Sequence, residues 1–124
     1  MKKIMEPIIV LKKSRRLISA PQNWTKGVYA RDANGKEASA TSPSAKSFCI
    51  IGAINKVVER GTVNAAAHNA LINAMPGTYP TITQFNDAEE TTHADIIAVI
   101  DAAIESIQER TLWGRLKTSI RSFL

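Results

Sequence analysis

Two residues of the chain, Cys49 and His93, have the side chains of a catalytic nucleophile and its base. We expect Cys49 in the first turn of a helix, where free backbone amides and the helix dipole stabilise a thiolate. His93 would then accept the thiol proton, and Asp87, Asp95 or Asn86 would orient the imidazole ring. Cys49, His93 and Asp87 would suit a cysteine-dependent hydrolase or transferase.

The same residues also have a purely structural interpretation. Cys49 would then be a small core residue beside Gly52, which lets another element approach closely, and His93 would bond the backbone near a helix start. We favour this interpretation, because a lone cysteine is commonly buried and the signatures of known cysteine hydrolases are absent.

A second group of residues suits ligand binding. Trp24, Tyr29 and Arg31 lie within eight positions of one another and could hold a planar or anionic ligand by ring stacking and a forked guanidinium contact. Asn86 would add an amide to this surface. Alternatively, Trp24 anchors a hairpin on the core while Arg31 pairs with Asp32 or Asp87. Neither a metal-ligand spacing nor a phosphate-binding loop is present, so we expect no metal and no cofactor.

The C-terminal extension, residues 111–124, is a candidate contact surface. Its apolar residues recur at intervals of three and four, and its basic residues fall largely on the other side; the apolar set is Leu112, Trp113, Leu116, Ile120 and Phe123. This pattern is typical of a basic amphipathic helix. We expect it to pack on residues 1–110, the single globular domain, or on a partner protein or a second copy. A membrane surface is disfavoured, since the apolar face is short.

Four segments must position these residues as helices, because apolar side chains recur in them at helical spacing: about residues 5–19, 47–59, 62–75 and 92–110. Ser47 is the expected cap of the second helix, and Thr92 and Asp95 have capping-box spacing. Alternation around an Asp-Ala-Asn-Gly turn predicts a hairpin of residues 27–31 and 36–40. Residues 76–90 are expected to form an irregular loop. The fold class is α+β, mostly helical, with four or five helices around one core and a small β-hairpin.

Composition limits the function further. With 124 residues, 44% of them hydrophobic and 22% charged, the chain has the size and make-up of one globular domain. A single cysteine excludes an internal disulfide, and no signal peptide or spanning segment is recognisable, so we expect a cytoplasmic protein.

The charge is +5 overall but unevenly distributed. The first quarter and the last ten residues are basic, whereas residues 87–109 are acidic. A basic surface is compatible with nucleic-acid binding, although no nucleic-acid motif accompanies it. The same asymmetry would let two copies associate head to tail.

Four motifs in order carry a family resemblance: Trp24-Thr25-Lys26-Gly27-Val28-Tyr29-Ala30-Arg31-Asp32, Phe48-Cys49-Ile50-Ile51-Gly52-Ala53, Phe85-Asn86-Asp87 and Thr92-His93-Ala94-Asp95. Over residues 8–107 the chain resembles a family of small bacterial and phage-encoded domains of unknown function. The resemblance implies no established activity. We therefore expect a non-enzymatic binding or protein-interaction module, in which the aromatic run and the two later helix beginnings come together.

Overall fold

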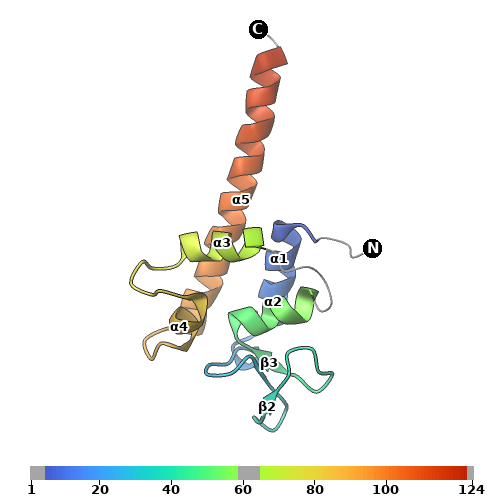
Figure 1. Cartoon of the computed structure of the whole chain (residues 1–124), viewed down its shortest axis with the longest axis vertical. Helices are drawn as coiled ribbons and strands as arrows, with labels where there is room; N and C mark the ends of the chain where they lie inside the picture. The colour runs from blue at the N-terminus through green and yellow to red at the C-terminus, as the bar shows by residue number, and fades with distance from the viewer. Residues whose placement is uncertain (1–4, 59–64, 123–124) are drawn as a thin grey trace.

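Helices dominate the architecture of the chain. The computed structural model describes residues 5–58 and 65–122, with the backbone alone for residues 118–122. In this part of the chain, five α-helices accompany a small antiparallel sheet (Figure 1), which confirms the expected mostly helical α+β class. The helices are α1 (Pro7–Leu17), α2 (Ile50–Val58), α3 (Ala65–Ala74), α4 (Ile82–Asp87) and α5 (His93–Ser122), and a 3₁₀ turn spans Pro21–Asn23.

The core lies where α5 crosses the other helices. The first half of α5 packs against α1 and α3, and α1 packs on α2. An apolar stripe of α5 that includes Ile96, Ile100 and Ala103 is buried there, together with Val10 and Leu11 of α1. In Figure 1 the second half of α5 continues away from this body as a single extended helix.

The sheet has three short strands, in the order β2-β1-β3. β1 (Ala30–Arg31) pairs antiparallel with β2 (Glu37–Ala38) on one side and with β3 (Ser47–Phe48) on the other. The predicted hairpin is therefore confirmed, but its strands are shorter than expected and the third strand was missed. Gly35 adopts a φ of 82° in the turn, a left-handed conformation that favours glycine.

Two helix boundaries differ from the prediction. Ser47 lies in β3 and so does not cap α2, which begins at Ile50. α5 does not end near Arg110 but runs to Ser122, because no proline and only one glycine interrupt it. The predicted end of the second helix and the start of the third fall within residues 59–64, outside the described residues.

The predicted irregular loop contains α4. Thr81 caps this helix: its hydroxyl accepts a hydrogen bond from the Gln84 amide at 3.0 Å. The predicted capping box of α5 is confirmed, since the Thr92 amide donates to Asp95 Oδ2 at 2.9 Å and the Asp95 amide donates to Thr92 Oγ1 at 3.2 Å.

Candidate functional site

Asn86, near the end of α4, joins three separate segments of the chain. Its side-chain oxygen accepts hydrogen bonds from Trp24 Nε1 at 2.8 Å and from the Ile50 amide at 3.1 Å. Its side-chain nitrogen donates to the Thr25 carbonyl at 3.1 Å and to Asp87 Oδ1 at 2.9 Å. Asn86 is 1% exposed, so these four bonds satisfy both donors and both acceptor positions of a buried amide.

Asp87 and Lys26 extend this connection between the aromatic run and the end of α4. Asp87 Oδ1 also accepts from the Gly27 amide at 2.9 Å. Lys26 donates to the Ala88 carbonyl at 2.6 Å, and its ammonium lies 5.4 Å from the Trp24 ring centroid. The expected meeting of the aromatic run with the later helix region is therefore confirmed.

His93, the first residue of α5, packs near the Trp24 ring. The two ring centroids are 6.0 Å apart and the planes are tilted by 52°. The His93 Nε2 atom is 2.7 Å from the Ile18 carbonyl oxygen, so this ring nitrogen is engaged with the backbone at the end of α1. His93 thus helps fix Trp24 and α1 to the start of α5.

Cys49 immediately precedes α2 and is 3% exposed. Its sulfur accepts a hydrogen bond from the Gly52 amide at 3.3 Å, and its own amide donates to the Tyr29 carbonyl at 3.1 Å. Burial raises the pKa of the Cys49 thiol, and the nearby Asp87 carboxylate raises it further, although hydrogen bonds from backbone amides oppose the rise. The thiolate that a nucleophile needs is therefore disfavoured.

A hollow of about 290 Å³ is lined by Cys49 together with Tyr29, Glu37, Asp87 and others. His93 is not among its lining residues. The structure therefore brings Cys49 and Asp87 to one hollow and leaves His93 beside Trp24.

Tyr29 and Arg31 have different environments within the hairpin. Tyr29 is 55% exposed, and its backbone carbonyl lies so close to α2 that a Cβ at Gly52 would be 1.9 Å from the oxygen. Arg31 donates to Thr25 Oγ1 at 2.8 Å and to the carbonyls of Gly35 and Lys26 at 3.1 Å each. Through these oxygens the guanidinium holds the hairpin turn against the preceding loop. The partners expected for Arg31 as an alternative, Asp32 and Asp87, are not the ones it uses.

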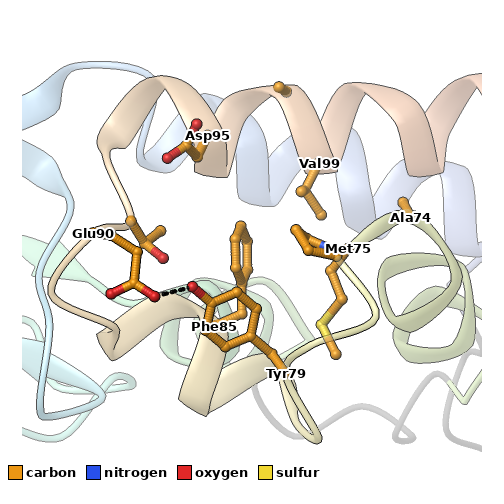
Figure 2. Close-up of a pocket in the computed structure, with 10 residues that line it drawn as sticks. Ala74, Met75, Tyr79, Phe85, Glu90, Asp95 and Val99 are labelled. Atoms are coloured by element: carbon orange, nitrogen blue, oxygen red, sulfur yellow. Dashed lines mark hydrogen bonds between the residues drawn. The ribbon is translucent and has the colours of Figure 1, made fainter.

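A second hollow, of about 450 Å³, lies between α3, α4 and the start of α5. Figure 2 shows the side chains that line it, among them the apolar Met75, Phe85 and Val99 and the polar Tyr79, Glu90 and Asp95. We call it the acidic hollow. Sequence reasoning missed it, because two of its walls come from the predicted irregular loop.

Tyr79 and Glu90 close one side of the acidic hollow. The Tyr79 hydroxyl donates to Glu90 Oε1, as the dashed line in Figure 2 marks. This hydrogen bond raises the pKa of Tyr79 and lowers the pKa of Glu90, because it stabilises the protonated phenol and the ionised carboxylate. The Tyr79 ring also packs on Phe85 at a centroid distance of 5.4 Å. The rim therefore carries negative charge above an aromatic wall.

The C-terminal extension exposes large apolar side chains. Leu112 is 66% exposed, Trp113 is 61% exposed and Leu116 is 45% exposed. The side chain of Ile120 and all of Phe123 lie outside the described residues.

The apolar stripe of the extension does not continue the core stripe of α5. With about 100° per residue, Leu112, Trp113 and Leu116 centre about 180° around the helix from Ile96 and Ile100. The extension therefore turns its apolar side away from the face that α5 uses to bury its first half.

Among the described residues, no group of three or more histidine, cysteine, aspartate or glutamate side chains could hold a metal ion. Within the same ranges, none of the helices combines the length and the apolar character needed to cross a membrane.

Comparisons with known proteins identify a family. No curated protein and no solved structure matches the chain. The model of a family of unknown function, DUF6197, matches residues 4–106, close to the range over which the motifs predicted a resemblance. The match ends within α5, before the C-terminal extension. The chain thus belongs to the DUF6197 family of unknown function.

Proposed function

We propose that the chain is a non-enzymatic protein-interaction module whose contact element is the second half of α5. One observation carries the proposal: α5 leaves the body of the domain with Leu112, Trp113 and Leu116 each more than two-fifths exposed. Large apolar side chains grouped on one helix face are typical of helices that bind a partner. The family match stops short of these residues, which fits a contact element added to a common scaffold.

The polar residues of the motifs support the same proposal from the other side. Asn86 is buried with its hydrogen-bonding positions filled, and the Arg31 donors are bound to oxygens of the hairpin and its preceding loop. Cys49 is buried with a raised thiol pKa. These groups are engaged in holding the fold, so the exposed apolar face of the extension is the stronger candidate for function.

We extend the proposal to the cytoplasm of a bacterium or of a phage-infected host. The support is the single, buried cysteine, which requires no oxidising compartment.

Hydrogen exchange on the full chain tests the contact element. We expect the amides of residues 110–117 to exchange slowly in the associated protein and quickly when the chain is dilute and free. Leu112→Ser with Leu116→Ser should remove this protection, because the buried apolar surface is lost. The matched control is Ile72→Ser, which removes an exposed apolar side chain from α3. The proposal fails if exchange at residues 110–117 stays fast under every condition, including in host-cell extract.

The same samples address nucleic-acid binding. Retention of an oligonucleotide at low salt that weakens steeply as salt is added would favour the nucleic-acid hypothesis over a protein contact.

A further inference from the structure

The acidic hollow and the C-terminal extension have complementary chemistry. The hollow has an apolar floor that includes Phe85 and Val99, and a rim with the carboxylates of Glu90 and Asp95. A fitting occupant is a large apolar side chain followed by a cation. Helix α5 itself carries this combination in Trp113 and Lys117, both exposed.

The extension cannot fill the hollow of its own chain. Val99 and Trp113 lie fourteen residues apart on one continuous helix, a separation of about 21 Å along its axis. Bringing them together would require α5 to break. The occupant must therefore come from another molecule, and charge complementarity selects a second copy of this chain.

We propose that the second half of α5 from one copy docks in the acidic hollow of a second copy, and that the contact is reciprocal. This inference rests on the proposed function and names the partner. The hollow borders α5 at Asp95, Ala98 and Val99. Viewed down the helix axis, the mean direction of these three positions lies within about 50° of the mean direction of the exposed apolar stripe. Two antiparallel α5 helices can therefore each present a stripe to the other's hollow, which makes a closed two-fold dimer and not an open chain.

The spacing along α5 matches at both ends of this contact. Trp113 and Lys117 are four residues apart, and so are Val99 and Asp95. In an antiparallel pair, placing Trp113 over Val99 of the second copy therefore places Lys117 beside Asp95. The indole then lies on the apolar floor and the ammonium faces the acidic rim.

The middle of the same face is the unfavourable part of the contact. Glu105 and Glu109 are exposed and lie between the hollow and the stripe, so the antiparallel pair brings carboxylates of the two copies near one another. Glu105→Gln with Glu109→Gln is expected to strengthen the dimer by removing this repulsion. A weaker dimer in this double variant would contradict the register.

Sedimentation of the full chain over a range of concentrations is the primary test. We expect a monomer–dimer equilibrium. Trp113→Ser with Lys117→Glu alters the extension, and Ala98→Lys places a cation at the rim of the hollow from an exposed position. Each variant should raise the dimer dissociation constant roughly tenfold or more, as expected for a central contact. Gln108→Lys is the control, because it adds one positive charge at an exposed position of α5 that is about 130° around the helix from the residues that border the hollow.

Mixing the two defective proteins gives the decisive result. The extension variant keeps an intact hollow, and Ala98→Lys keeps an intact extension, so a mixed dimer retains one of its two contacts. We expect the mixture to associate more strongly than either variant alone.

Three outcomes would overturn the inference. The first is a monomer at every concentration, and the second is a protein that associates only with vesicles of anionic phospholipid. The third is a dimer that Ala98→Lys leaves unchanged, which would indicate that two extensions pair with each other. In the third case residues 110–117 would still be protected from exchange, so the proposed function would survive.

Discussion

Replacing Asn86 with alanine should remove a large share of the stability of the domain. The substitution deletes four hydrogen bonds and leaves three groups of other segments without their partner: Trp24 Nε1, the Ile50 amide and the Thr25 carbonyl. A buried polar group left unsatisfied costs about 1–3 kcal/mol. Allowing for water that enters the space, we expect a loss of about 3–5 kcal/mol in the free energy of unfolding. That is a substantial fraction of the roughly 5–15 kcal/mol of a typical domain.

Chemical denaturation followed by circular dichroism measures this loss as a shift of the midpoint. The matched control is Asn73→Ala, an exposed asparagine on α3, which should change stability by less than about 0.5 kcal/mol. A loss below about 1 kcal/mol for Asn86→Ala would refute the reasoning, because it would mean that the four bonds add little beyond those made to water.

Asn86→Asp separates the two halves of the amide. The oxygen that accepts from Trp24 and Ile50 is kept, but the donor is replaced by an oxygen that faces Asp87. Burial and this neighbouring carboxylate should raise the pKa of the new side chain above its value in the unfolded chain. The variant is therefore expected to recover stability as the pH falls toward 4, relative to Asn86→Ala at the same pH. Parallel pH profiles for the two variants would contradict this expectation.

Three further predictions concern helices α2 and α5. Gly52→Ala should prevent normal folding or lower the melting temperature sharply, because the added carbon would meet the Tyr29 carbonyl. Gly114→Ala has nothing within 4 Å of the added carbon, so it should raise helicity and stabilise α5 by about 1 kcal/mol. Equal shifts of the melting temperature for the two variants would contradict this prediction. Cys49 should resist alkylation in the folded protein and react only on unfolding. Rapid alkylation of Cys49 in the folded protein would disprove its burial. Because burial raises the pKa of the thiol, the contribution of this group to stability should be complete below its pKa in the unfolded chain and lost as the pH rises through its pKa in the folded protein. Asp95→Ala should cost about 1 kcal/mol or less by removing the capping box, and an unchanged melting curve would reject that role.

The helices were predictable from the sequence where apolar spacing was long and regular. Ile96, Ile100 and Ala103 recur at helical spacing, and they form the buried stripe of α5. α4 has only six residues, too few to show a period, yet Thr81 and Gln84 have capping-box spacing that indicates a helix start. β3 has only two residues and is defined by its pairing with β1. No local pattern could have found it, because its hydrogen bonds are made at a distance in the sequence.

Trp24, Asn86 and His93 were expected to meet, and they do so. The hydrogen bonds that these residues make were not predictable. No local pattern indicates that Asn86 accepts a hydrogen bond from the first amide of α2, since this bond joins residues 36 positions apart. The prediction that Ser47 caps α2 was wrong, because the Asn86 side chain of α4 accepts the hydrogen bond from the amide at the start of α2. Helix ends need partners, but the partner need not be local.

The C-terminal extension lies outside the motifs on which the family resemblance rests, whereas the acidic hollow includes two motif residues, Phe85 and Asp95. Trp24 and Asn86 connect the aromatic run, α2 and α4, so these motif residues stabilise the fold. The domain would lose stability if their hydrogen-bonding groups bound a ligand in place of one another. The exposed groups are the apolar side chains of the extension and the carboxylates that rim the acidic hollow. An apolar stripe turned away from the core leaves apolar surface in water at a cost of about 25 cal/mol per Å². Burying that stripe against a partner recovers this free energy. The physical case for a contact at the second half of α5 is therefore independent of any motif, and it would stand even if the partner were not a second copy.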